Sequence, residues 1–189
     1  MYLFFDTETT GLPRDYNAPI EDVNNWPRLV QLAWALYNTD ELLIEQRNYI
    51  IRPVGFVIPH EVIRIHGITN ELALAKGFPL IDVLNEFIVA MDKASHLVAH
   101  NISYDLNILG AEGIRTQIKI PFDKMVHICT MRSSAEFCKI PGTYGYKWPN
   151  LNELYLTLFR EPIQNGHNAL VDVNACARSF FELKRRGAL

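Results

Sequence analysis

The sequence predicts an α/β fold in which helices flank a mixed sheet of five strands, an antiparallel meander followed by parallel strands. Three β-rich segments follow one another within residues 1–53, and after them helical segments alternate with short apolar strands. A short turn joins antiparallel neighbours, whereas a crossover through a helix joins parallel ones. We expect residues 1–189 to form one domain, because chains of this length commonly fold as one.

The first three strands are predicted at residues 2–5, 28–38 and 42–53. The first is short and apolar, as a central strand requires, and the other two are rich in β-branched and aromatic residues. Residues 39–41, Thr-Asp-Glu, form the turn between the second and the third. Residues 13–27 are a polar, proline-containing excursion after the first strand. We expect this loop to lie near the acids that end that strand.

In the rest of the chain, apolar residues at helical spacing alternate with short apolar strands. The clearest helix contains apolar residues every three or four positions from Leu80 to Met91, so one of its faces packs inward. The prolines and glycines of residues 131–150 indicate a helical turn and a long loop. The predicted helices are 79–94, 104–113, 151–159 and 168–186, and the predicted strands are 96–101 and 124–130.

The composition excludes several classes of protein. With 49% hydrophobic and 21% charged residues the chain is typical of a globular protein, and no apolar stretch reaches the roughly 18 residues of a membrane span. No basic segment precedes the apolar N-terminal run, which indicates a strand rather than a secretion signal and predicts a cytoplasmic protein. The 3 cysteines form no CxxC pair, which argues against a disulfide framework or a structural zinc site. The net charge of −3 lacks the basic excess of many nucleic-acid binders.

The first predicted strand ends in two acids, Asp6 and Glu8, within FDTETTG. Side chains alternate along a strand, so these two carboxylates point to the same side. Like charges this close repel unless a cation or hydrogen-bond donors offset the repulsion. A divalent ion such as Mg²⁺ prefers oxygen ligands of this kind. A solvated strand end that leads into a Thr-Gly turn is the structural alternative, and this motif alone favours it.

Two further segments favour the metal-binding interpretation over a solvated strand end. Asp105 follows the apolar segment HLVAH at the start of a helix, and His167 and Asp172 stand at the start of the last helix. Each has a structural explanation by itself, because an acid suits the dipole of a helix N-terminus and Asn168 can cap the last helix. Together with the paired acids, however, they bring four carboxylates and one histidine to the edge where open α/β sheets bind ligands.

Three motifs, in this order, resemble those of the DEDDh 3'-5' exonucleases. This family of the ribonuclease-H-like superfamily includes the proofreading subunit of bacterial DNA polymerase III. The resemblance spans about residues 2–186 and implies a ribonuclease-H-like sheet. Histidine five residues before the last aspartate is typical of the histidine class rather than the tyrosine class. The motifs are FDTETTG with Asp6 and Glu8, HNISYD with Asp105, and HNALVD with His167 and Asp172.

The resemblance implies a reaction in which two divalent metal ions, Mg²⁺ or Mn²⁺, clamp the scissile phosphate. By this resemblance Asp6 would bridge both ions. Glu8 and Asp172 would complete one ion site, and Asp105 would support the other, partly through water. His167 would act as the general base that activates the attacking water.

The segment HEVIRIHGIT is similar to one that contacts the terminal nucleotide in this family. Glu61 and His66 are the candidate contacts, although a histidine before a glycine also commonly ends a helix. By the same resemblance Leu12 would wedge against the terminal base, and the backbone of the TTG turn would touch the 3' hydroxyl. Trp26 and Trp148 fall in predicted loops, where they either cover the edge of the core or stack on bases.

The resemblance predicts an enzyme that releases nucleoside 5'-monophosphates from the 3' end of single-stranded DNA or RNA. The sequence does not separate DNA from RNA, so 3' trimming of RNA or degradation of oligoribonucleotides is the alternative. A DNA polymerase or another replication protein is a candidate partner, whereas no membrane is expected. The chain ends soon after the KRR at 184–186, without the C-terminal extension of a proofreading subunit, which favours a free-standing nuclease.

Two other functions fit the sequence less well. A haloacid-dehalogenase-type phosphatase also begins with paired acids after its first strand, but the second is normally Asp, and here it is Glu8. The pair of His167 and Asp172 would have no role in such an enzyme. A catalytically silent nucleic-acid-binding or polymerase-scaffolding domain would not need all four acids and the histidine.

Overall fold

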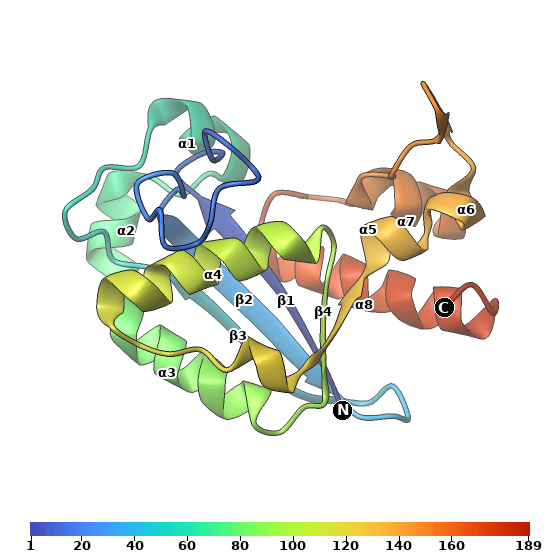
Figure 1. The fold of residues 1–189 in the computed structure, drawn as a ribbon, viewed down its shortest axis with the longest axis horizontal. Helices are drawn as coiled ribbons and strands as arrows, with labels where there is room; N and C mark the ends of the chain where they lie inside the picture. Colours follow the sequence, from blue (N-terminus) through green and yellow to red (C-terminus); the bar gives the residue numbers. More distant parts are fainter.

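The computed structural model describes residues 1–189 and contains a mixed five-stranded sheet (Figure 1). Its strands are β1 (Tyr2–Thr9), β2 (Leu29–Tyr37), β3 (Leu43–Ile50), β4 (His96–Ala99) and β5 (Val126–Cys129). They lie in the order β3-β2-β1-β4-β5. The pairs β1–β2 and β2–β3 are antiparallel, whereas β1–β4 and β4–β5 are parallel. The predicted antiparallel meander followed by parallel strands is therefore confirmed.

Helices cover both faces of the sheet (Figure 1). α3 (Leu80–Met91) and α4 (Ile102–Thr116) lie on one face. α8 (Ala169–Arg185) lies on the other face and packs beside α7 (Leu151–Phe159). No helix combines the length and the apolar character that crossing a bilayer would require.

The central strand β1 contributes to two hydrophobic cores, because its side chains alternate between the faces of the sheet. Leu3 and Phe5 pack in the core beneath α3 and α4. Phe4 packs in the core beneath α8, where its ring centroid lies 5.3 Å from that of Phe180. Asp6 follows two residues after Phe4, so the strand directs this first acid toward the face that α8 covers.

Two short helices lie in residues 54–78, where the sequence indicates no more than a candidate helix end at His66. They are α1 (His60–His66) and α2 (Asn70–Lys76), with 7 residues each. Helices this short have little intrinsic stability and depend on packing. Here a small apolar cluster around Val30 of β2 supplies that packing.

The segment 131–150 is more ordered than the predicted helical turn and loop. Two four-residue helices lie here: α5 (Thr130–Ser133), which begins one residue before the segment, and α6 (Ala135–Cys138). A separate two-stranded hairpin follows, formed by β6 (Pro141–Gly142) and β7 (Gly145–Tyr146). The hairpin projects from the body of the protein (Figure 1).

α4 is longer than predicted. It begins at Ile102 and continues past Gly113, the predicted end, to Thr116. Gly113 serves packing rather than helix termination, because a Cβ at this position would lie only 2.7 Å from the carbonyl oxygen of Ile118. A short 3-10 helix, η1 (Phe122–Lys124), then leads into β5.

A buried carboxylate joins α4 to the start of β2. Glu112 is fully buried, and its Oε1 accepts hydrogen bonds from the backbone NH of Leu29 and from Arg28 Nε, both at 2.9 Å. Arg115 Nη1 lies 3.1 Å from the same oxygen. Two guanidinium groups and one backbone donor thus offset the cost of burying the charge. The cluster holds α4, which carries Asp105, against the sheet.

We expect Glu112→Ala to lower the free energy of unfolding by about 3–5 kcal/mol, because it leaves two guanidinium groups and a backbone NH without their acceptor. Urea unfolding followed by circular dichroism measures the loss. The matched control is Glu161→Ala, which removes the exposed ion pair with Arg178 (2.8 Å) and should cost at most about 1 kcal/mol. Equal losses for the two variants would argue against a structural role for the buried cluster.

Candidate active site

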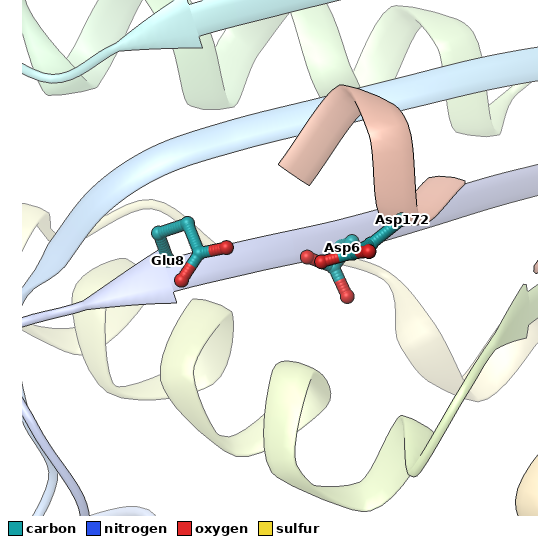
Figure 2. A group of neighbouring side chains, drawn as sticks. All are labelled: Asp6, Glu8 and Asp172. Atoms are coloured by element: carbon teal, nitrogen blue, oxygen red, sulfur yellow. The ribbon is translucent and has the colours of Figure 1, made fainter. Parts of the chain in front are cut away.

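Three carboxylates converge beside β1. One oxygen from each of Asp6, Glu8 and Asp172 lies within 4.8 Å of the other two (Figure 2). Asp6 and Glu8 both extend from β1, where they pair in register with Ala33 and Gln31 of β2. Asp172 reaches them from the first turn of α8. Oxygen donors arranged in this way suit a hard divalent cation.

The start of α8 is fixed by two side chains. Asn168 caps the helix, because its Oδ1 accepts a hydrogen bond from a backbone NH of the first turn at 3.1 Å. Ala169 donates its backbone NH to Gln31 Oε1 of β2 at 3.2 Å. Gln31 is buried and stands opposite Glu8 in the sheet, so this bond places Asp172 next to the acids of β1.

Asp105 approaches β1 from the other face of the sheet. It lies in the first turn of α4 and is 3% exposed. Its Oδ1 accepts hydrogen bonds from the backbone NH of Thr7 at 3.0 Å and from Thr7 Oγ1 at 2.6 Å. Thr7 stands between Asp6 and Glu8, so Asp105 lies beside the three converging carboxylates without belonging to their group.

Burial raises the pKa of all four acids, and the charges of neighbouring acids raise those of Asp6 and Glu8 further. Burial raises the pKa of Asp6 well above its usual value, and the charges of Asp105 and Asp172 raise it further. Burial and the charge of Asp172 raise the pKa of Glu8 to about 8, and burial raises that of Asp105 to about 7. None of the four forms an ion pair with a basic side chain. In the absence of a cation, bound protons are what relieves the repulsion.

A polar pocket of about 530 Å³ opens beside Asp6 and Asp172. His167 lines it from the loop before α8, and its side chain is exposed. The backbone NH of His167 donates to Asp172 Oδ2 at 3.0 Å, and its φ is 64°, a conformation uncommon for a residue with a Cβ. The structure thus brings this histidine and Asp172 together through the backbone and leaves the imidazole at the rim of the pocket.

A second pocket, of about 310 Å³, borders Glu8. Its walls include Leu12, which is 72% exposed, and His66, which is buried. His66 Nδ1 accepts a hydrogen bond from the Ile68 NH at 3.0 Å, whereas its Nε2 has no partner. Glu61 lies in the first turn of α1, is exposed, and does not line this pocket.

The second motif, HNISYD, contains two further residues that line the pockets, His100 and Tyr104. His100 lines the polar pocket and is hydrogen-bonded to Thr130 Oγ1 and to the carbonyl of Pro149, both at 3.0 Å. Burial lowers its pKa to about 4, so its ring is neutral. Tyr104 lines the second pocket and donates its hydroxyl to the carbonyl of Gly11 at 2.8 Å. Their position within HNISYD is the sequence signal that points to them.

The two loop tryptophans have different environments. Trp26 is buried in the larger core and donates its Nε1 to the carbonyl of Pro19 at 3.1 Å. Trp148 is more than half exposed and lies two residues before Asn150, which lines the polar pocket. The polar excursion at 13–27 also contributes Tyr16 to the second pocket, so this loop lies next to Glu8.

Comparisons with known proteins point to one family. The family described as RNase_T, exonuclease, matches residues 3–180. Among curated proteins, a DNA polymerase III PolC-type of Mycoplasmopsis pulmonis is 31% identical over 130 residues, which is 69% of this chain and 8% of that protein. The 3'-5' exonuclease DinG of Bacillus subtilis is 26% identical over 184 residues, 96% of this chain and 17% of DinG. The chain therefore spans less than a fifth of the length of these relatives.

Solved structures share the fold. E. coli Exonuclease I in complex with a dT13 oligonucleotide matches with a TM-score of 0.76 at 17% identity, over 98% of this chain and 41% of that one. Exonuclease X in complex with 5' overhanging duplex DNA matches with a TM-score of 0.62 at 21% identity, over 99% and 93%. At these identities the likeness establishes the ribonuclease-H-like fold alone. Since the family match covers nearly the whole chain, this chain belongs to the RNase_T exonuclease family, of the DEDD 3'-5' exonuclease type.

Proposed function

We propose that this chain is a metal-dependent 3'-5' exonuclease that releases nucleoside 5'-monophosphates from the 3' end of a single strand. The observation that carries the proposal is the group of three carboxylates, Asp6, Glu8 and Asp172, whose charges no basic side chain balances. In a chain that belongs to an exonuclease family, a cation site of this kind is suited to act on a phosphodiester.

The donor set fits two divalent ions. Every donor is a carboxylate oxygen, which suits Mg²⁺ or Mn²⁺. When bound, such ions neutralise charge on the scissile phosphate and make water a better nucleophile. In this proposal Asp6 would hold both ions, and Glu8 and Asp172 would complete one of the sites. Asp105, whose carboxylate is oriented by Thr7, supports the other, partly through water.

We assign His167 the role of general base. It lines the polar pocket together with Asp6 and Asp172, so its ring borders the place where an attacking water would lie. Its backbone is held by Asp172 while its side chain is exposed, which leaves the ring free to turn as substrate enters. The imidazole takes the proton of the water, the oxygen of the water bonds to phosphorus, and the 3' oxygen of the penultimate nucleotide departs.

We propose that the second pocket binds the terminal nucleoside, with Leu12 against the base. His66 is neutral because burial lowers its pKa. Its Nδ1 accepts from the Ile68 NH, so we assign the ring proton to Nε2. Nε2 is buried, so its donation to the nucleotide requires the ring to turn toward the pocket. Glu61 lies outside the pocket wall and would contact only a group that extends beyond the pocket.

We also propose which nucleic acid the enzyme acts on and which class of protein it works with. Single-stranded DNA is favoured by relatives named as DNA polymerase III PolC-type and as 3'-5' exonuclease DinG. RNA is the second candidate, because a structure of similar fold (TM-score 0.75, 18% identity) shows a 3'-exonuclease in 3'-end specific recognition of a histone mRNA stem-loop. A polymerase or other replication protein is the proposed partner class. We also propose that residues 1–189 form one domain and that the protein is cytoplasmic.

We expect a single-stranded oligodeoxynucleotide labelled at its 5' end to shorten step by step when Mg²⁺ or Mn²⁺ is added, with nucleoside 5'-monophosphate as the product. Denaturing gels show the ladder, and excess EDTA should stop it. Matched RNA and double-stranded substrates, digested side by side, identify the preferred nucleic acid. A strand that stays intact after metal addition would rule out the proposed activity.

For His167→Ala we expect a rate loss of roughly 10²- to 10⁴-fold, the range for removal of a general base. Metal binding should be retained, because the bond of this residue to Asp172 comes from its backbone NH. Single-turnover kinetics measure the rate and calorimetry with Mn²⁺ measures the binding. His60→Ala is the control, since His60 is exposed and lines neither pocket. Unchanged turnover in His167→Ala would remove this residue from the reaction.

We expect the metal-free protein to lose stability as pH rises from about 5 to 8. Glu8, with a pKa of about 8, and Asp105, with a pKa of about 7, keep protons in the folded state that the unfolded chain has already released. Folding is therefore favoured at low pH and disfavoured as pH rises through the folded-state pKa values.

Thermal unfolding in excess EDTA across this pH range measures the effect. Added Mg²⁺ should stabilise the folded state that binds it, and should raise the melting temperature most at the alkaline end, because protons no longer compete with the ion for the carboxylates there. Asp6→Asn, which removes one of the clustered charges, should show a shallower pH dependence and a smaller gain with metal. A melting temperature that is constant or rises with pH in EDTA would show that the carboxylates are not clustered.

A further inference from the structure

A hairpin with exposed aromatic side chains stands near the proposed active site. Formed by β6 and β7, it projects beyond α7 (Figure 1). Tyr144 at its tip is 101% exposed, and Tyr146 and Trp148 are 46% and 56% exposed. None of the three belongs to a hydrophobic core cluster. The fold therefore gains little from these rings, and large aromatic groups left in water are suited to contact a ligand.

The hairpin also carries positive charge and no acid. Residues 139–148, KIPGTYGYKW, include two lysines and neither Asp nor Glu. Lys147 pairs with Glu153 at 2.6 Å, whereas Lys139 is exposed and has no ion pair. The guanidinium of Arg132 lies 5.2 Å from the centre of the Trp148 ring. Aromatic faces combined with positive charge are the features by which proteins bind single-stranded nucleic acid without reading its sequence.

The base of the hairpin is continuous with the polar pocket. Trp148 is followed by Pro149, whose carbonyl accepts a hydrogen bond from His100 Nε2 at 3.0 Å. The next residue, Asn150, caps α7 and lines the pocket together with the acids. The residues that lead out of the hairpin thus form part of the wall of the pocket that contains Asp6 and Asp172.

We propose that this aromatic hairpin binds the nucleotides upstream of the scissile phosphate, with bases stacked on Tyr144, Tyr146 and Trp148. The inference rests on the proposed exonuclease function, because it concerns the part of the same substrate that does not react. Lys139 attracts the phosphate backbone. Every base has a π face, so stacking of this kind accepts any sequence, as an enzyme that removes successive nucleotides requires.

Two substrates of different length test the proposal. An oligodeoxythymidylate of about twelve nucleotides can reach both the acids and the hairpin, whereas the p-nitrophenyl ester of thymidine 5'-monophosphate reaches the acids alone. The double variant Tyr144→Ala, Tyr146→Ala should lower kcat/KM for the oligonucleotide by roughly 10- to 100-fold and leave that for the ester unchanged. Ile44→Ala, which removes an exposed apolar side chain from edge strand β3, is the control and should change neither. Equal losses on both substrates, or no loss on either, would overturn the proposal.

Failure of the exonuclease function gives a different result, because the unaltered protein would then hydrolyse neither substrate. Binding by the hairpin is read separately from tryptophan fluorescence. Trp26 and Trp34 are buried, so quenching by added oligonucleotide reports on Trp148. We expect such quenching in the unaltered protein and its loss in Trp148→Phe. Without any quenching, the hairpin has no role in binding the strand.

Discussion

The gathering of four carboxylates in a partly buried site is the constraint on which the rest of the structure depends. Asp6 and Glu8 lie on a strand covered on both faces, and Asp172 and Asp105 are brought against it from opposite sides of the sheet. The raised pKa values of Glu8 and Asp105 express the cost of this placement. Groups held at such a cost are typical of functional sites, because a divalent cation supplies the missing charge when it binds.

The surrounding fold prevents the acids from relaxing apart. The bond from Ala169 to Gln31 fixes the start of α8 on β2, and the buried Glu112 fixes α4 on the other side. Each acid thus comes from a rigid element rather than from a mobile loop, which is how a site keeps its geometry before the ligand arrives. His167 differs, since it lies in a loop at the pocket rim, and this difference suits a group that moves a proton while the metal ligands stay in place.

Much of the fold follows from local sequence patterns. The apolar first strand, the short connection between the second and third strands and the later alternation with helices were enough to predict a mixed sheet that begins as an antiparallel meander and continues with parallel strands. α1 and α2 could not be predicted, since seven residues give too little periodicity and their stability comes from tertiary packing. The motif order selected four acids that the fold brings close together, but the bond between Thr7 and Asp105 joins residues 98 positions apart and needs the folded chain. Trp26 and Trp148 show the same limit, because the burial of a loop residue depends on distant neighbours.

In the proposed function, Asp6, Glu8 and Asp172 would form a platform for two metal ions. The most direct measurement is X-ray diffraction at the manganese absorption edge, from crystals grown with Mn²⁺ and a nucleoside 5'-monophosphate. We expect two anomalous peaks about 3.5–4 Å apart, with Asp6 between them and Glu8 and Asp172 on one of the ions. The absence of peaks at these carboxylates, or peaks elsewhere on the protein, would contradict the claim.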